Sequence, residues 1–386
     1  MPRLDRLGVL IAGLVGVALL ALPFAVFRAN RIVAGEGVSL ADALALPAFL
    51  AAGTVLCAAA LIGLLRTPAV PRLLAALAAL LAIALSIGMV PDHLVAPGNA
   101  YARVSPSSGF WLLLFAFGLM ATDALTRLRP PPVARIAILA AAIGCLALIL
   151  WSGRWDGLSL MREYDSRADS FWRELGRHLV LALGSLAASV VIGVPLGIAC
   201  HRVARLRTPI LSSLNIVQTI PSIALFGLLI APLGWLAANV PLAAALGIRG
   251  IGVAPAFVAL FLYSLLPVVA NTVVGLASIP PEADDAARGV GMTDRQRLLS
   301  VELPLAFPVI LTGIRIVLVQ NIGLATIAAL IGGGGLGVFV FQGIGQTAMD
   351  LVLLGALPTV ILAFSAAVIL DAAVEASSHR TTGERA

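Results

Sequence analysis

The residues best suited to specific chemistry lie in the polar segment 278–305, SIPPEADDAARGVGMTDRQRLLSVELPL. This segment is too polar to lie in lipid and too long to be a tight connection between helices. Within it, the small residues Ala286 and Ala287 would let a helix pack deeply into a groove of a partner, and Gly291 permits a sharp turn. Charged residues flank them and would orient such a contact. These residue types suit docking to another protein, and we do not expect this chain to be an enzyme.

A first short helix is expected to open with Pro280 and Pro281 and to end at Gly289 and Gly291. Proline is favoured in the first helical turn because its missing N–H is not needed there. Acidic side chains in that turn suit the positive end of the helix dipole, and here they are Glu282, Asp284 and Asp285.

A second short helix is expected after Gly291, with Thr293 or Asp294 as its N-cap. Pro304 is expected to stop this helix before the next apolar segment begins, since proline lacks the N–H that a helix interior needs. The two helices and the turn between them would form a helix–turn–helix projection. We call residues 278–305 the finger.

A single basic residue, Arg315, lies inside the apolar segment 306–330, ~13 Å from its start at a rise of 1.5 Å per residue. A charge at that depth in a membrane marks a solute pathway or its gate, or it forms a structural ion pair within or between subunits. A bare cation there would attract the carboxylate of a betaine and repel a quaternary ammonium group.

Several uncharged polar residues also interrupt apolar segments of the second half. Each is a candidate either for lining a solute pathway or for hydrogen bonding between helices, which is the commoner role. These candidates are Gln218, Ser222, Tyr263, Asn271 and Asn321.

The elements that must position these residues are membrane helices. The sequence is 60% hydrophobic and only 11% charged, and its mean hydropathy is +1.06. A soluble domain of this size needs far more charge on its surface. A bilayer core of ~30 Å is crossed by about 20 apolar residues in a helix. We therefore expect an all-α, polytopic membrane protein.

About ten transmembrane helices are expected, over 7–27, 43–65, 73–90, 109–126, 133–151, 178–200, 209–231, 251–277, 306–330 and 349–373. A cleaved signal peptide is the alternative for the first segment, because Arg3 and Arg6 precede it. Three cysteines, Cys57, Cys145 and Cys200, lie in apolar segments without metal or disulfide spacing.

The charge pattern indicates orientation rather than nucleic-acid binding. The net charge is +6, and all 25 basic residues are Arg. Arg is concentrated in alternate short loops, which predicts a cytoplasmic location for those loops and for both termini in a bacterial inner membrane. Because the sequence has no Lys, it has no Walker A loop, which uses Lys to reach nucleotide phosphates. Transport driven by ATP would need a separate ATPase subunit.

No bound cofactor or metal is expected. Gly332, Gly334 and Gly337 satisfy G-x-G-x-x-G, but a dinucleotide site needs a strand before this motif and a helix after it. Here the glycines join two apolar segments, and we interpret them as a flexible turn where backbones pack closely.

The composition divides the chain into four parts. Residues 1–151 are expected to form an accessory N-terminal membrane domain of about five helices, followed by a periplasmic linker over 152–177. Phe171, Trp172 and Leu175 predict a short helix on the outer membrane surface within that linker, with a solvated linker as the alternative. Residues 178–375 would form the functional core, and 376–386 a cytoplasmic tail.

The finger resembles the EAA loop of ABC importer permeases. That loop has Glu-Ala-Ala, three residues, Gly, nine residues, Ile, one residue and Leu-Pro. The matching positions here are Asp285, Ala286, Ala287, Gly291, Val301, Leu303 and Pro304. Asp replaces the usual Glu and Val the usual Ile, and both replacements keep the chemistry. The resemblance implies a five-helix type I permease core whose finger docks on a cytoplasmic ATPase.

Further segments resemble permeases of the glycine betaine, carnitine and choline importers, namely 215–226, 255–276 and 328–337. This resemblance implies import of an osmoprotectant by an assembly with a periplasmic solute-binding protein and a second permease copy or a related permease. The sequence departs from the pattern where Ala270 replaces a residue that is often basic, and in its five additional N-terminal segments.

Three other functions are consistent with the sequence. The same machinery could carry another solute, such as an amino acid or a phosphonate. A secondary transporter would use acidic proton relays, but the acids Asp123, Asp350 and Asp371 lie near the ends of apolar segments. A membrane sensor would use the first five segments for sensing.

Overall fold

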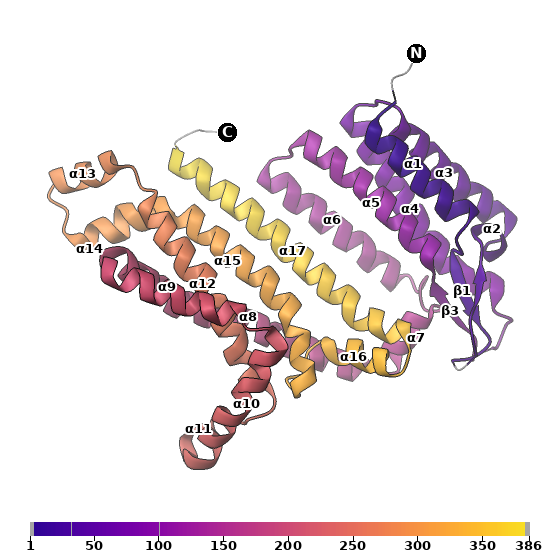
Figure 1. The fold of residues 1–386 in the computed structure, drawn as a ribbon. Helices are drawn as coiled ribbons and strands as arrows, with labels where there is room; N and C mark the ends of the chain where they lie inside the picture. The colour runs from indigo at the N-terminus through magenta and orange to yellow at the C-terminus, as the bar shows by residue number, and fades with distance from the viewer. Residues whose placement is uncertain (1–3, 32, 100, 383–386) are drawn as a thin grey trace. The chain divides into compact units, whose positions relative to one another are not determined.

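A computed structural model describes residues 4–31, 33–99 and 101–382 of the chain. These residues form two compact units. The first contains residues up to 131 together with 140–166, and the second contains 132–139 together with the chain from 167 onward. Figure 1 shows the helices and strands, and each unit is described separately below.

Nine helices of the described residues are long and apolar enough to cross a membrane, which agrees with a polytopic, all-α protein. In the first unit they are α3 (Leu46–Leu64), α4 (Ala69–Leu94), α5 (Ser108–Leu128) and α6 (Pro132–Trp151), whose first residues 132–139 belong to the second unit. In the second unit they are α8 (Ala168–Arg202), α10 (Ser222–Asn239), α12 (Val253–Ala277), α15 (Leu303–Ala325), which continues a helical run from Asp294, and α17 (Met349–Thr382).

The first unit is a helical bundle in which α1 (Arg6–Leu20) packs beside α3 and α5. Its centre is formed by side chains with almost no exposure, including Ile11, Leu56, Ile83 and Phe117. α1 is shorter than the other apolar helices, at 15 residues. The segment expected to span the membrane over 7–27 is therefore helical only in its first part.

A small three-stranded antiparallel sheet follows α1, and the sequence pattern did not predict it. Its strands are β1 (Ala25–Arg28), β2 (Glu36–Val38) and β3 (Arg103–Pro106), in the order β2-β1-β3. The short helix α2 (Leu40–Ala43) comes directly after β2. Strands of three or four residues carry too little alternation to be detected from one sequence.

Four charged side chains of the first unit form an ion-pair cluster at the N-terminus of α1. Arg72 is fully buried and lies 3.2 Å from Asp5 and 3.1 Å from Asp123. Arg127 contacts the same two carboxylates, at 3.2 Å and 3.0 Å. Burial acts to raise the pKa of Asp5, but hydrogen bonds from the Gly8 N–H, Arg127 and Arg72 outweigh it and lower that pKa to about 2.

The segment expected to be a linker has a defined structure. Part of it forms α7 (Ser159–Asp165). The Trp155 indole N–H donates to the Ala84 carbonyl at 2.8 Å, and Arg162 donates to the Ala102 carbonyl at the same distance. The short surface helix expected over 166–177 is not a separate element, because α8 runs without interruption from Ala168 to Arg202. Phe171 is buried and its ring lies near that of Phe339, whereas Trp172 is 60% exposed, so these two side chains do not share one exposed side as the sequence pattern predicted.

The second unit is centred on α12, which lies between α8 and α15. Small residues allow the close approach of these helices. Gly193 and Gly197 of α8 face Val268 and Thr272 of α12, and Gly313 of α15 faces Asn271. An added Cβ at any of the three would come within 3 Å of its neighbour. This is the small-residue packing typical of membrane helices.

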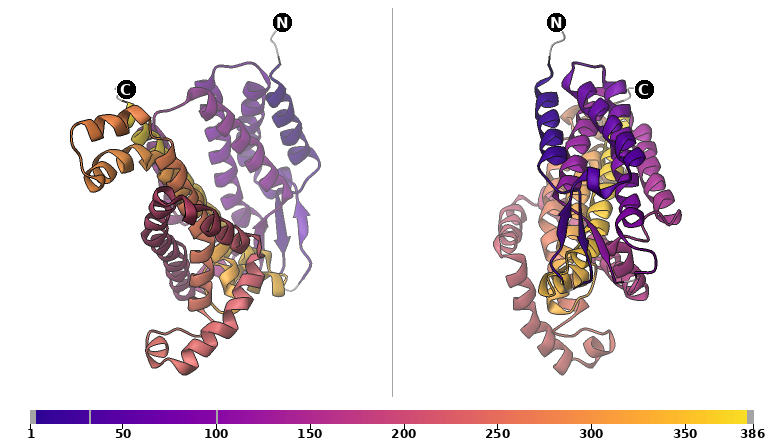
Figure 2. Two further views of the ribbon diagram at one scale, coloured as in Figure 1. Left: turned by 60° about the vertical axis from the view of Figure 1, so that its left-hand side comes forward. Right: turned by 90° about the vertical axis from the view of Figure 1, so that its right-hand side faces the viewer.

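The remaining elements complete the second unit. They are α9 (Ala204–Thr219), α11 (Pro241–Ala245), α13 (Pro281–Gly289), α14 (Asp294–Arg297), a π-helical turn Leu298–Glu302, a 3₁₀ turn Ile327–Ile331 and α16 (Gly337–Gly345). The segment expected to span over 209–231 is two helices, since α9 ends before Pro221 and α10 begins after it. Within this unit, α10 and α11 project away from α8, α12 and α15 (Figure 2).

The glycine-rich turn after α15 lies where backbones pack closely, as we interpreted from the sequence: a Cβ added at Gly337 would clash with the Thr326 carbonyl oxygen. Gly332, Gly334 and Gly335 have φ values of 77°, 77° and 87°, which only glycine adopts readily. The buried carboxylate of Glu174 accepts a hydrogen bond from the Gly335 N–H at 2.8 Å. The turn lies between the 3₁₀ turn and α16, so it lacks the preceding strand that a dinucleotide site requires.

The expected tail over 376–386 is in part the end of α17. Residues 383–386, which include Arg385, lie outside the described residues, as do Arg3 and the other residues before Leu4.

Candidate functional site

The finger has the helix–turn–helix form that the sequence predicts. Its first helix, α13, has Pro281 in its first turn and Glu282 and Asp284 close to its N-terminus. The chain then turns at Gly291, whose φ is 79°. A side chain is strained in that left-handed region, which explains why glycine occupies this position.

The second helix of the finger begins with a reciprocal capping box. The Thr293 hydroxyl accepts a hydrogen bond from the Gln296 N–H at 3.4 Å. The Gln296 side-chain oxygen accepts one from the Thr293 N–H at 2.9 Å. Thr293, rather than Asp294, is therefore the N-cap, and both orphan donors are satisfied.

Pro304 does not stop this helix, and that expectation was wrong. The chain continues from α14 through the π-helical turn Leu298–Glu302 into α15, and Pro304 lies in the first turn of α15. In the π-helical turn the Leu303 N–H bonds the Leu298 carbonyl, five residues back. This wider turn places the change in hydrogen-bonding pattern next to Pro304, which supplies no N–H. The finger is thus joined to α15 by a continuous helical backbone.

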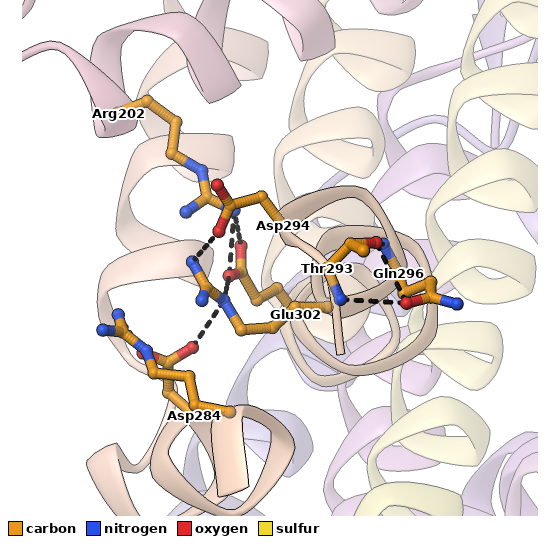
Figure 3. Close-up of polar contacts among 8 residues, drawn as sticks. Arg202, Asp284, Thr293, Asp294, Gln296 and Glu302 are labelled. Carbon is orange, nitrogen blue, oxygen red and sulfur yellow. Dashed lines mark hydrogen bonds and ion pairs between the residues drawn. The ribbon is translucent and has the colours of Figure 1, made fainter. Parts of the chain in front are cut away.

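A neutral network of charged side chains holds the finger in place (Figure 3). At its centre, Arg297 lies 2.8 Å from Asp284 of α13, 3.1 Å from Asp294 and 2.9 Å from Glu302. Only 7% of the Arg297 side chain is exposed. Arg288 lies 2.8 Å from Asp284 on its outer side. One guanidinium therefore ties both helices of the finger to the start of α15.

Glu302 extends the network to α8. Its two carboxylate oxygens accept hydrogen bonds from Arg202, at the end of α8, at 2.9 Å and 2.8 Å. The Glu302 side chain is 7% exposed and that of Arg202 is 34% exposed. Charge-assisted bonds to a shielded carboxylate are the stronger kind. A displacement of the finger is therefore coupled to two membrane helices, α8 and α15.

Sequence reasoning missed this network. Asp284, Arg297 and Glu302 are visible in the finger as charges, but their partners depend on how α13 folds back over the π-helical turn. Arg202 is separated from Glu302 by 100 positions. The available signal was the five acidic and three basic residues of the finger, a segment that the charge pattern placed next to the membrane.

The residues matched to the EAA pattern divide between an exposed and a buried side. Asp285 and Ala286 are exposed, and Val290 beyond them is 75% exposed. Ala287 is 5% exposed, so its methyl group packs within this chain rather than on the outer surface. The last matched positions join the finger to the membrane helix: Val301 and Leu303 are half-buried, and Pro304 is exposed. The exposed side of α13 and its C-cap Val290 therefore carry small, acidic and apolar groups.

Arg315 is not a bare cation. Its guanidinium forms a short ion pair with Asp371 of α17. Asp371 also lies 3.1 Å from Arg135 at the start of α6, and Arg135 lies 2.7 Å from Glu375. Paired ionic groups of this kind hold membrane helices together. The geometry therefore favours the structural alternative for Arg315, joining α15, α17 and the first turns of α6.

Gln218 and Tyr263 brace α9 against α12. Pro267 has no N–H, so it leaves the carbonyl of Tyr263, four residues earlier, without its helical donor. The Gln218 side-chain amide donates to that carbonyl at 2.6 Å. In return, the Tyr263 hydroxyl donates to the Ile220 carbonyl at the end of α9. Gln218 thus supplies the donor that Pro267 removes, which is how membrane helices accommodate proline, and Tyr263 bonds the carbonyl at the end of α9.

Asn321 and Asn271 also form hydrogen bonds between or within helices. Asn321 is fully buried and donates to the hydroxyls of Ser185 and Ser264, both at 2.9 Å. This joins α15 to α8 and α12. The Asn271 amide donates to the Pro267 carbonyl at 2.8 Å. Ser222 is half-buried in the first turn of α10.

A multi-pass bundle of apolar helices with a polar finger held between two of them is the arrangement of a membrane transport component. The family described as "binding-protein-dependent transport system inner membrane component" matches residues 189–383. The chain belongs to this family. Residues 5–161 match a second family, described as "ABC transporter permease YehY, N-terminal domain".

Relatives that match about half of the chain include osmoprotectant permeases. The osmoprotectant import permease protein OsmW of Salmonella typhimurium is 46% identical over 50% of this chain and 84% of its own length. The glycine betaine/carnitine/choline transport system permease protein OpuCB of Bacillus subtilis is 36% identical over 54% of this chain and 86% of its own. Among solved structures, an inward-facing form of the MetNI methionine ABC transporter matches 54% of this chain and 96% of its own, at 24% identity and a TM-score of 0.47.

Proposed function

We propose that this chain is the transmembrane permease subunit through which an ATP-driven importer carries an osmoprotectant, such as glycine betaine or a related quaternary amine, across the bacterial inner membrane. The observation that carries this proposal is the geometry of the finger. Its exposed side is free to dock on a partner, while Arg297 and Glu302 fasten it to α15 and α8. A push on the finger is thereby transmitted to helices of the membrane core.

The partner on the finger is an ABC ATPase subunit in the cytoplasm. This chain contains no Lys and so has no Walker A loop, which leaves ATP binding and hydrolysis to that partner. This chain itself binds no cofactor and catalyses no reaction. The Arg-rich short loops support a cytoplasmic location for the finger and for both termini.

Two further partners complete the importer. A periplasmic solute-binding protein delivers the cargo, and a second copy of this chain or a related permease forms the other half of the pathway. The relatives OsmW, an osmoprotectant import permease protein, and OpuCB, a glycine betaine/carnitine/choline permease protein, support an osmoprotectant as cargo. Aromatic cages for a quaternary ammonium group would lie in the binding protein. The N-terminal unit is an accessory membrane domain.

The test is ATP hydrolysis by the complex of this chain with its ATPase subunit, reconstituted in lipid with the solute-binding protein. Glycine betaine, carnitine and choline should each be compared with an amino acid and a phosphonate. We expect stimulation by at least one quaternary amine. Stimulation by an amino acid or a phosphonate alone would refute the proposed cargo, and the absence of any ATPase partner would refute the coupling role of the finger.

A further inference from the structure

One exposed stripe of α9, beside the exposed apolar side chain of Ile216, is polar at a depth where lipid would be expected. α9 runs beside α12, and its inward residues Leu211 and Leu214 pack on Leu265 and Val269 of α12. At the far end of α9, Gln218 reaches the Tyr263 carbonyl. α9 therefore covers the half of α12 nearer the finger rather than lying on the membrane surface.

The distances along α12 confirm this depth. Tyr263 lies about 15 Å along the axis from the first residue of α12 and about 21 Å from its last, at 1.5 Å per residue. The end of α9 is thus near the middle of a bilayer core of ~30 Å. The start of α9 follows directly on Arg202, which is bound to Glu302 beneath the finger.

Four uncharged polar residues form a stripe along α9. They are Thr208, Ser212, Asn215 and Thr219. Their spacing of four, three and four residues places them on one side of the helix, and all four are exposed. Leu214, which faces α12, is 9% exposed. The stripe therefore points away from the packed core of this unit.

Lipid is a poor environment for this stripe. The Thr219 hydroxyl is satisfied by the Ile216 carbonyl at 2.7 Å. The Asn215 amide has no hydrogen-bond partner among the residues that the structure describes. Burying an unpaired amide in an apolar medium costs roughly 2–7 kcal/mol. Membrane helices direct such groups to a bundle interior or to water, and not to acyl chains.

We infer that Thr208, Ser212, Asn215 and Thr219 line a water-filled passage for solute in the half of the membrane nearer the finger. Hydroxyl and amide groups hydrate a small solute without presenting a charge, so they suit a quaternary amine that a cationic wall would repel. This inference rests on the proposed transport function, and it assigns the passage to a different set of residues from the candidates named in the sequence.

The test is the accessibility of single cysteines to a membrane-impermeant, charged methanethiosulfonate. Asn215→Cys would be made with Cys57, Cys145 and Cys200 replaced by Ala, and the complex with its ATPase subunit placed in lipid nanodiscs. Val191→Cys is the matched control. Val191 is apolar and 72% exposed, and it lies two residues from Gly193, which faces Val268 at the depth of Leu214.

We expect Asn215→Cys to react about tenfold or more faster than Val191→Cys, with or without ATP, because the reagent requires a hydrated thiolate. Equal, slow reaction at both positions would overturn the inference, since it would place the stripe against lipid or in a dry interface with a second copy. The two proposals fail separately. Slow labelling of Asn215→Cys in a complex whose ATPase activity responds to glycine betaine would refute the passage only. Fast labelling in a complex whose ATPase activity does not respond would refute the proposed cargo only.

Discussion

Replacing Glu302 by Gln should loosen the finger without unfolding the membrane core. The substitution removes the charge that holds Arg202 through two oxygens and Arg297 through one. Because Glu302 is 5% exposed, the substitution leaves the shielded guanidinium of Arg297 with only Asp284 and Asp294 as ionic partners. Breaking a buried pair of this kind costs about 3 kcal/mol. A destabilisation of that size raises the open population of the finger by ~150-fold.

Hydrogen–deuterium exchange over residues 281–297 of the reconstituted complex measures this opening. The matched control is Asp294→Asn, because Asp294 also contacts Arg297 but its side chain is 87% exposed. An exposed pair contributes about 0–1 kcal/mol, so exchange in the control should rise by less than about fivefold. In Glu302→Gln, both solute uptake and the protection of the finger from hydrogen exchange should fall. In the control, uptake should stay near the wild-type level. Equal exchange in the two variants would refute the network as the fastening of the finger.

Three further perturbations have expected outcomes. Gly291→Val should destabilise the finger by about 1–3 kcal/mol, because φ at Gly291 is positive, and should uncouple ATP hydrolysis from uptake. The control Gly289→Ala should have neither effect. Equal uptake by the two variants would contradict this expectation. Gln218→Leu should lower the free energy of unfolding by about 1–2 kcal/mol, and with it the melting temperature of the complex, because it leaves the Tyr263 carbonyl without a donor. An unchanged melting temperature would contradict the role of Gln218 in joining α9 to α12. Asp5, whose pKa is lowered to about 2, should contribute its full stabilisation above about pH 4 and lose it as the pH falls to about 2. Asp5→Asn should therefore flatten the dependence of stability on pH between these values. Identical pH profiles for the variant and the wild type would contradict this.

Local chemistry allowed the helical elements to be predicted. Long apolar segments are helices because a membrane leaves backbone groups no other partners. In the finger, the proline start at Pro281, the turn at Gly291 and the Thr293 cap each act within one helical turn. Features of that kind depend on neighbours in the sequence, so a single sequence contains them.

Features that depend on distant partners were not predictable. Arg315 could be recognised in the sequence as an unusual charge, but its pairing with Asp371 depends on how α15 packs on α17. Gln218 was legible as polar, but its role follows from a backbone carbonyl that Pro267 frees on another helix. The expectation that Pro304 ends a helix was wrong because a π-helical turn precedes it and the helical backbone continues. The general rule that proline stops a helix does not predict such a turn.

The interface between the finger and an ATPase subunit is the claim on which the account depends most. It is tested most directly by attaching a photoreactive thiol reagent to Val290→Cys, which is 75% exposed on the finger, in the cysteine-free background and in native membranes. We predict a cross-link to an ATP-hydrolysing subunit from Val290→Cys and none from Val191→Cys. Cross-links from Val290→Cys only to lipid, or to proteins without ATPase activity, would contradict the account.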